Sequence, residues 1–194
     1  MRYFHTIFPN VLIFSDTVIF WSNDDSIESL EELIEVSYKF NYQSILYQFP
    51  VRGTLLYDEI VHDDFRLPNE GGGIYNINSV FGKGIVDAYK KTGQQNWAGT
   101  VIDKSITKFL NNRKVDSEEF LKNHAKKYVV PYKEEYALRL TKEDINEETF
   151  NNTRDCIKNN FSNHNKNSTS QDVQTKLENT LKYLESFKQN GNTK

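Results

Sequence analysis

The chain has 194 residues, of which 37% are hydrophobic and 26% charged, values that suit one soluble globular domain with or without a small appendage. No apolar run approaches the roughly 18 residues that a membrane span needs, so the sequence predicts no membrane span. Residues 1–14 hold no small-residue cleavage site typical of a signal peptide. The single cysteine, Cys156, excludes an internal disulfide. We therefore expect a cytoplasmic protein.

The net charge of −3 is unevenly distributed along the chain. Residues 1–103 hold 7 Lys and Arg against 14 Asp and Glu, a net of −7, whereas residues 104–194 hold 17 against 13, a net of +4. An acidic front half argues against nucleic-acid binding in that region. It suits a site that holds divalent cations, although a solvated surface is the simpler interpretation.

The sequence predicts that the chain opens with a β-hairpin and a helix. Residues 11–22 are rich in β-branched and aromatic side chains but long for one strand, so we expect a hairpin that turns near Ser15 and Asp16. Apolar residues recur at helical spacing over residues 26–47, and Pro50 ends this helix. At the turn, Asp16 is either an ordinary turn residue or a ligand for a hard cation.

The middle of the chain predicts further strands and helices. The order strand, helix, strand, loop, helix, strand is typical of an α+β or α/β layer in which helices pack on a sheet. In chain order we expect a strand region over residues 51–60, a polar loop over 61–79, a helix over 80–91 capped by Ser79, a strand over 99–103 and a short helix over 104–110.

The last part of the chain has a different composition. Residues 111–140 mix polar and aromatic side chains without a clean period, and residues 146–167 contain eight Asn and indicate a loop-rich connection. Residues 171–187 predict an amphipathic helix, which we expect to dock on the domain or on a partner chain. The predicted organisation is a core over residues 1–110 and a mixed, mainly helical extension over residues 111–194.

Several other motifs are weak. Asp24-Asp25 and Asp63-Asp64 are paired carboxylates that could bind a divalent cation, but adjacent acids in a loop are usually only solvated. The three glycines at 71–73 lack the Lys-Ser/Thr of a phosphate loop. No His lies at the motif spacing of a hydrolase triad.

The order of five segments resembles the class III nucleotide cyclases. FSDTVIFWSND, an amphipathic helix, PVRGTLLYDE, FGKGIVDAYKK and WAGTVID follow one another from about residue 9 to residue 103, as in the later two-thirds of adenylate and guanylate cyclase domains. The likeness is closer to the bacterial pyrimidine cyclases of the Pycsar anti-phage systems. It implies an α+β cyclase-like fold, with an antiparallel or mixed sheet, packed helices and a helical C-terminal extension.

The resemblance implies a site for a nucleoside triphosphate, in a homodimer. Asp16 would bind Mg²⁺ or Mn²⁺, and Lys90 would be the catalytic residue that stabilises developing charge. The implied reaction converts a pyrimidine nucleoside triphosphate into a 3′,5′-cyclic nucleotide and pyrophosphate, as an anti-phage signal. The residues implied to bind the nucleotide are Ser15, Arg52, Ser79 and Lys83.

The sequence also departs from the family's pattern. The family's first metal aspartate lies on an earlier strand, and no Asp or Glu occurs among residues 1–14. The Lys and Asp of purine cyclases are replaced by Leu12 and Ser79, and the helical Asn and Arg by Val86 and Lys90. Lysine keeps the positive charge but not the bidentate fork of arginine. Leu12 and Ser79 argue against adenine recognition of the usual kind. The missing first strand with its aspartate is the main support for the alternative, a catalytically inactive cyclase-homology module that binds nucleotide or dimerises.

Overall fold

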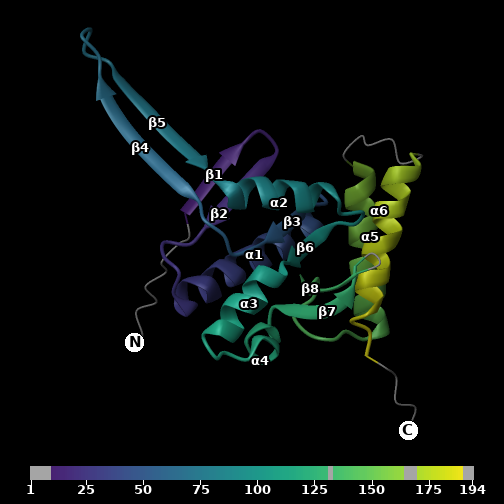
Figure 1. Ribbon diagram of the computed structural model, residues 1–194. Helices are drawn as coiled ribbons and strands as arrows, with labels where there is room; N and C mark the ends of the chain where they lie inside the picture. Colours follow the sequence, from purple (N-terminus) through teal and green to yellow (C-terminus); the bar gives the residue numbers. More distant parts are fainter. Residues whose placement is uncertain (1–9, 131–132, 164–169, 190–194) are drawn as a thin grey trace, which may run out of the picture.

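The computed structural model describes residues 10–130, 133–163 and 170–189, and within these ranges the chain is an α+β protein (Figure 1). This confirms the expected α+β class. In chain order the elements are β1 (Asn10–Phe14), β2 (Thr17–Trp21), α1 (Ile27–Tyr47), β3 (Arg52–Leu55), β4 (Val61–Pro68), β5 (Ile74–Phe81), α2 (Lys83–Gly93), β6 (Gly99–Ile102), α3 (Lys104–Asn112), α4 (Ser117–Leu121), β7 (Ala125–Val129), β8 (Glu134–Leu138), α5 (Glu147–Asn163) and α6 (Gln171–Glu185).

A four-stranded mixed sheet, in the order β3-β6-β8-β7, lies at the centre of the molecule. β3 and β6 are parallel, and the other two pairs are antiparallel. The sheet therefore joins two strands that precede residue 110 to two strands that follow it. The hairpins β1–β2 and β4–β5 each form a separate two-stranded sheet.

The helix α1 confirms the expected helix and connects both parts of the hydrophobic core. Its N-cap is Ser26, whose side chain accepts a hydrogen bond of 3.1 Å from the backbone N–H of Ser29. Leu33 and Ile34 pack in a cluster with α3 and α4, while Ile45 packs in a second cluster with α5 and α6. One long amphipathic helix thus spans the whole core.

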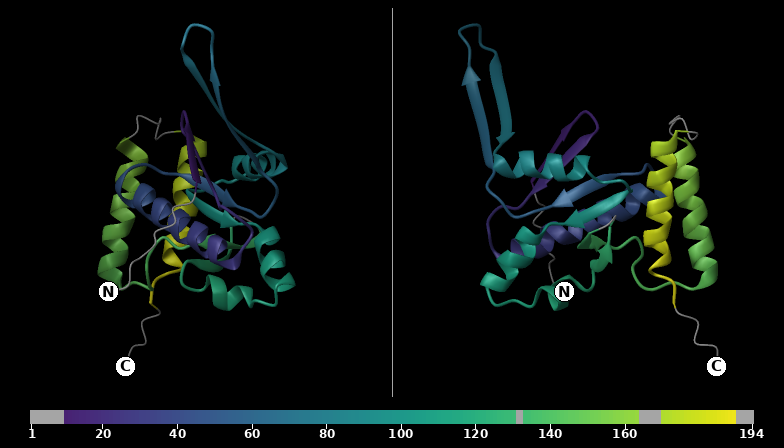
Figure 2. Two further views of the ribbon diagram at one scale, coloured as in Figure 1. Left: turned by 90° about the vertical axis from the view of Figure 1, so that its left-hand side faces the viewer. Right: turned by 45° about the vertical axis from the view of Figure 1, so that its right-hand side comes forward.

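The helices α5 and α6 lie side by side at one end of the sheet (Figures 1 and 2). Tyr183 of α6 is fully buried, and its hydroxyl donates a hydrogen bond of 3.0 Å to the carbonyl of Ala137 in β8. Burial raises the pKa of the Tyr183 phenol well above its usual value. The expected C-terminal helix is confirmed, and it docks on the sheet of the same chain.

The prediction of a polar loop over residues 61–79 is wrong. These residues form the strands β4 and β5, an antiparallel arm that projects from the body of the molecule (Figure 1). The turn between them uses Gly72 at a φ of +78°, a conformation that glycine adopts readily. The polar sequence hid the strands because a projecting ribbon buries neither face against the core.

The arm also changes the predicted start of the following helix. Ser79 lies within β5, opposite Asp63, and does not cap a helix. α2 begins at Lys83, and its N-cap is Gly82. The expected helix therefore exists, but it starts later than the apolar pattern indicated.

The loop-rich connection expected over residues 146–167 is also wrong in its described part. Residues Glu147–Asn163 form α5, which buries Phe150, Ile157 and Phe161 along one stripe. The side chain of Asn146 accepts a hydrogen bond of 2.9 Å from the Thr149 N–H at the start of this helix. Packing of the apolar stripe outweighs the weak helix propensity of its many Asn residues.

Candidate functional site

The turn of the β1–β2 hairpin presents Ser15 and Asp16, as the sequence predicted. Phe14 pairs with Thr17, which leaves a two-residue turn in which Ser15 has a φ of +55°. Asp16 is exposed, and within the described residues no hydrogen bond or ion pair to its carboxylate is recorded. An uncompensated carboxylate at the tip of two apolar strands is available to bind a cation.

A large open hollow of about 2200 Å³ extends from this turn along β2, β3 and α2. Four of the six predicted site residues line it, from three different elements or turns. The structure therefore brings together residues that lie up to 75 positions apart in the sequence, from Ser15 to Lys90. The four residues are Ser15, Asp16, Arg52 and Lys90.

Two cations on the wall of the hollow have no counter-charge in the described structure. Arg52 at the start of β3 and Lys90 on α2 are exposed, and neither forms an ion pair with any residue that the structure describes. The third cation that lines the hollow, Lys176, is paired with Asp172 at 2.5 Å. Arg52 and Lys90 are thus available for an anionic ligand such as a phosphate.

Lys83 and Ser79 do not line this hollow. The Lys83 ammonium lies 2.6 Å from a carboxylate oxygen of Asp58 and 2.9 Å from one of Asp87. The hydrogen bond to Asp58, followed by that to Asp87, raises the pKa of Lys83. Ser79 lies at the base of the arm. The geometry assigns Lys83 an ion-pairing role at the start of α2.

The residues around Asp16 suit one metal ion better than a preformed pair. Across the described ranges, no three His, Cys, Asp or Glu side chains are grouped so that they could hold a metal. Mg²⁺ is commonly held by one or two carboxylates together with water and substrate phosphates. Asp16 alone therefore fits an ion that arrives with a nucleotide, and it does not fit a site that holds two ions without substrate.

Two glycines in the FGKG segment shape the start of α2. Gly82 has a φ of +140°, and a Cβ atom there would lie 2.8 Å from the carbonyl oxygen of Glu59. The Gly84 N–H donates a hydrogen bond of 3.2 Å to the same oxygen. The glycines thus allow residues 58–60 to cross the start of the helix, which places Asp58 beside Lys83. In the sequence, the close approach of residues 58–60 to α2 was indicated only by the two glycines that flank Lys83.

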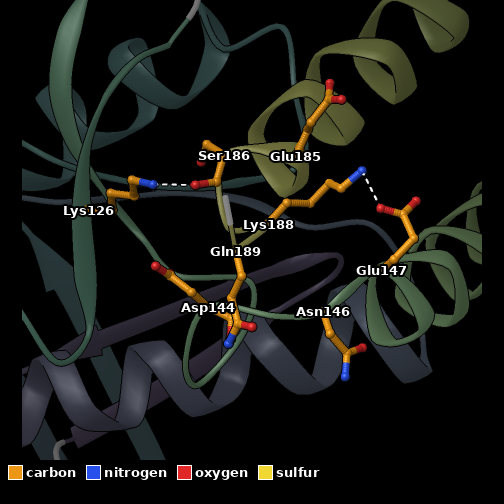
Figure 3. A pocket seen from close by; sticks show the side chains of 8 residues that line it. All are labelled: Lys126, Asp144, Asn146, Glu147, Glu185, Ser186, Lys188 and Gln189. Atoms are coloured by element: carbon orange, nitrogen blue, oxygen red, sulfur yellow. Dashed lines mark hydrogen bonds and ion pairs between the residues drawn. The ribbon is translucent and has the colours of Figure 1, made fainter. Parts of the chain in front are cut away.

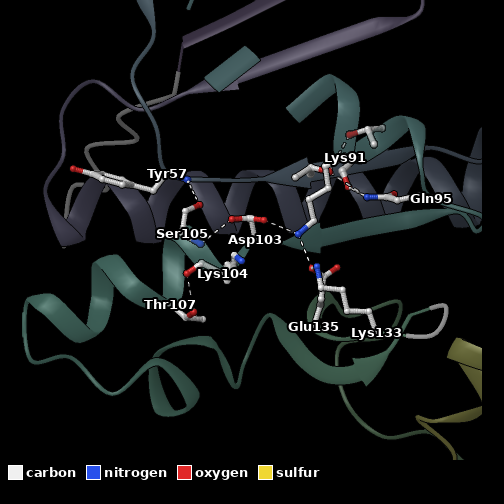
Figure 4. Close-up of polar contacts among 12 residues, drawn as sticks. Tyr57, Lys91, Gln95, Asp103, Lys104, Ser105, Thr107, Lys133 and Glu135 are labelled. Carbon is white, nitrogen blue, oxygen red and sulfur yellow. Dashed lines mark hydrogen bonds and ion pairs between the residues drawn. The ribbon is translucent and has the colours of Figure 1, made fainter. Parts of the chain in front are cut away.

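An ion-pair network behind α2 escaped sequence reasoning. Figure 4 shows the Lys91 ammonium between the carboxylates of Asp103 and Glu135, at 2.6 Å from each. These three side chains come from α2, the end of β6 and β8, and all three are mostly buried. The sequence could not distinguish Lys90 from Lys91. Lys90 lines the hollow, whereas Lys91 connects α2 to the sheet through its two ion pairs.

Hydrogen bonds hold Asp103 in its charged form. Burial favours the neutral acid, but the hydrogen bonds from Lys91 and from the Ser105 N–H are together stronger and lower the pKa of Asp103 to about 2. The same carboxylate caps α3, because it accepts a bond of 2.8 Å from the Ser105 N–H. For Lys91, burial is outweighed by its two carboxylate partners, and its pKa is raised.

A second, smaller hollow of about 720 Å³ lies where α6 ends near β7 (Figure 3). Two of its lysines already have partners. The Lys188 ammonium lies 2.6 Å from the Glu147 carboxylate, and Lys126 donates a hydrogen bond to the Ser186 carbonyl. No predicted site residue lines it. We therefore place the candidate site at the larger hollow.

Comparison with protein-family models, with curated proteins and with solved structures found no match for this chain. No described helix combines the length and the apolar character that crossing a bilayer requires.

Proposed function

We propose that this protein is a nucleotidyl cyclase-like domain that acts on a pyrimidine nucleoside triphosphate. The observation that carries the proposal is the single hollow that contains Asp16, Arg52 and Lys90. Two unpaired cations and one unpaired carboxylate that line the same hollow match a triphosphate and its metal ion in charge. The sequence resemblance to pyrimidine cyclases supplies the substrate class and the role in anti-phage signalling.

In the proposed reaction the ribose 3′-oxygen attacks the α-phosphorus and forms the cyclic ester. The bond from the α-phosphorus to the bridging oxygen breaks, pyrophosphate leaves, and the proton of the 3′-hydroxyl passes to solvent. Arg52 and Lys90 bind the phosphates and stabilise charge on the departing pyrophosphate. A bound Mg²⁺ or Mn²⁺ neutralises phosphate charge and lowers the pKa of the attacking hydroxyl. Asp16 is the residue that would hold this ion, and Ser15 lies beside the phosphates at the same turn.

The exposed apolar side chains support a homodimer. Phe65 and Leu67 on the arm are 51% and 54% exposed, and Ile13 and Phe14 on β1 are 68% and 76% exposed. The arm and the β1–β2 hairpin project on the same side of the molecule (Figure 2). Apolar side chains gathered on projecting elements are characteristic of protein interfaces, and a second copy would cover them.

A catalytically inactive module is the second candidate function. It is favoured because no described group of three His, Cys, Asp or Glu side chains could hold a metal, and because Val86 stands on α2 where the family has an amide. Such a module would bind the nucleotide through Arg52 and Lys90 without converting it, or would only dimerise.

Turnover with each of the four nucleoside triphosphates and Mn²⁺ separates the two candidates. We expect a cyclic product and pyrophosphate from CTP or UTP, and loss of both in Asp16→Asn. Asp63→Asn, which alters the arm outside the hollow, is the matched control and should retain activity. Nucleotide binding without product would establish the inactive module, whereas folded protein that neither binds nor converts any nucleotide contradicts the enzyme and leaves only the dimerising form of the second candidate.

A further inference from the structure

The helix α2 turns one continuous face towards the hollow. Five of the α2 residues that line it follow one another at positions i, i+3, i+4, i+7 and i+8, which is the spacing of a single helix face. They are Ile85, Ala88, Tyr89, Thr92 and Gly93. Tyr89 lies in the middle of this face, and Lys90 is the next residue in the chain.

Hydrogen bonds fix this face of α2 against the strand that carries Arg52. The Thr92 hydroxyl donates a hydrogen bond of 2.9 Å to the Thr54 hydroxyl on β3, and the Gln95 side-chain amide donates one of 2.7 Å to the Gly53 carbonyl. Arg52 begins the same strand. The helix face and the strand that holds Arg52 are therefore tied together at two points, on one wall of the hollow.

The Tyr89 side chain is uncovered although it lies on the wall of a hollow. It is 77% exposed, and no hydrogen bond or ring contact is recorded for it within the described residues. Tyr57, which also lines the hollow, differs because its ring stacks on Phe109 with a centroid distance of 4.3 Å. An aromatic ring gains free energy when another planar group covers it. Tyr89 therefore has ring surface available to a ligand that enters the hollow.

Gly93 leaves space beside that ring. It lies one turn after Tyr89 on the same face of α2. Because helical side chains lean towards the N-terminus, a side chain at position 93 would lie over the turn that holds Tyr89. A Cβ atom placed on Gly93 would meet no neighbouring atom within 4 Å. The place from which a side chain would cover Tyr89 is therefore open, and a flat ring can enter it.

The groups around Tyr89 suit a ligand that is both flat and anionic. Lys90 and Arg52 line the same hollow, and neither forms an ion pair within the part of the chain that the structure describes. A nucleotide carries its base and its phosphates on opposite sides of the ribose, so the two ends of the ligand need different partners. Cations bind the phosphates, and an aromatic side chain stacks on the base whatever hydrogen-bonding groups that base carries.

We propose that Tyr89 is the base-binding residue of the nucleotide site. The pyrimidine ring stacks on the phenol ring of Tyr89 in the space that Gly93 leaves open, while the phosphates lie at Arg52 and Lys90. The substrate class rests on the proposed function, but the assignment of Tyr89 concerns binding alone and applies equally to an enzyme and to an inactive module that binds nucleotide. Because stacking acts on the base, Tyr89 contributes to the binding of a nucleotide and not to that of a free polyphosphate.

Calorimetric titration with CTP and with inorganic tripolyphosphate, each with Mg²⁺, tests the assignment. Tyr89→Leu removes the ring and should weaken CTP binding by about fivefold or more, but tripolyphosphate binding by less than about twofold. Tyr89→Phe keeps the ring and should bind both ligands as the wild type does. Both variants should fold because the side chain is exposed, and circular dichroism checks this. Equal effects of Tyr89→Leu on the two ligands, or no effect on either, would overturn the assignment.

Arg52→Gln separates this failure from failure of the proposed function. If Arg52→Gln weakens CTP binding and Tyr89→Leu does not, the nucleotide site stands and the assignment of the base to Tyr89 is wrong. A folded wild-type protein that binds neither CTP nor tripolyphosphate would overturn the proposed nucleotide site, and the assignment with it.

Filling the open space and observing the base directly complete the test. Gly93→Leu places a side chain over Tyr89 and should weaken CTP binding by about fivefold or more without changing tripolyphosphate binding. In proton NMR spectra, the protons on the cytosine ring of bound CTP should shift upfield in the wild type and in Tyr89→Phe but not in Tyr89→Leu, because a stacked aromatic ring shields them. If Tyr89→Leu weakens self-association and leaves CTP binding unchanged, a second copy covers the ring, which would contradict the assignment.

Discussion

Lys90 and Lys91 are adjacent in sequence but have different surroundings. Lys90 is exposed on the wall of the hollow, and Lys91 joins two carboxylates from β6 and β8. The sequence was least informative about individual residues. Periodicity places a residue on one face of a helix, but it does not show which charged side chains the fold will bring close to that residue.

Replacing each lysine in turn tests which of the two stabilises the fold. Lys91→Met leaves Asp103 and Glu135 as two mostly buried like charges, and we expect it to lower the free energy of unfolding by about 2 kcal/mol. Lys90→Met should change it by less than about 0.5 kcal/mol, because an exposed side chain without an ion pair contributes little. Urea denaturation of both variants measures this difference. Equal destabilisation by the two substitutions would contradict the structural role of Lys91.

Asp103 predicts how stability depends on acid pH. Its pKa is lowered from 3.8 to about 2 in the folded protein. A lowered pKa contributes stability that is complete above about pH 4 and is lost as the pH falls towards 2. Partial exposure limits this contribution to about 1 kcal/mol.

The measurement is the difference in unfolding free energy between wild type and Asp103→Asn, taken at several pH values. We expect the difference to shrink between pH 4 and pH 2 and to stay constant between pH 5 and pH 7. A difference that does not vary with pH would mean that the ionised form of Asp103 adds no stability.

At the scale of elements, the sequence predicted those with a strong period. The helix over residues 26–47 was correct because its apolar residues follow the helical pattern that burial requires. The hairpin around Asp16 was correct because a run of β-branched and aromatic residues, too long for one strand, surrounds a turn pair. The arm and α5 were missed for opposite reasons. The arm is a ribbon that buries neither face in this chain, and α5 depends on packing against α6 more than on its own propensity.

Gly82 gives a prediction at the junction of the arm and α2. Gly82→Ala should lower the free energy of unfolding by about 1–3 kcal/mol, because the residue has a positive φ and its Cβ would meet the Glu59 carbonyl at 2.8 Å. Gly93→Ala is the control, since no atom lies within 4 Å of its Cβ position. Thermal unfolding compares the two, and a Gly82→Ala protein as stable as the control would contradict the close approach.

At the scale of the whole molecule, the arm and the β1–β2 hairpin project together from a compact body (Figure 1). The candidate site lies at the foot of these projections, on the side where exposed apolar residues gather. The sequence predicted the α+β class, and four of its six candidate site residues line the hollow, while their roles stay predictions. It did not predict the arm, because residues 61–79 are mostly polar and contain three consecutive glycines, a composition typical of loops.

The arm gives a prediction about association. Phe65→Asp places a charge on the apolar face and should weaken self-association at least tenfold, if a second copy covers that face. Arg66→Asp, on the opposite face of the same strand, should have a smaller effect because successive residues of a strand alternate in direction. Sedimentation equilibrium measures both. A wild-type protein that stays monomeric at all concentrations would contradict the homodimer.

The measurement that most directly tests the central claim is calorimetric titration of CTP and UTP with and without Mn²⁺. If Asp16, Arg52 and Lys90 act on one ligand, Asp16→Asn should weaken nucleotide binding at least tenfold only when Mn²⁺ is present. Arg52→Gln and Lys90→Met should weaken it in both conditions. Unchanged affinity in all three folded variants would contradict the assignment of these residues to a single nucleotide site.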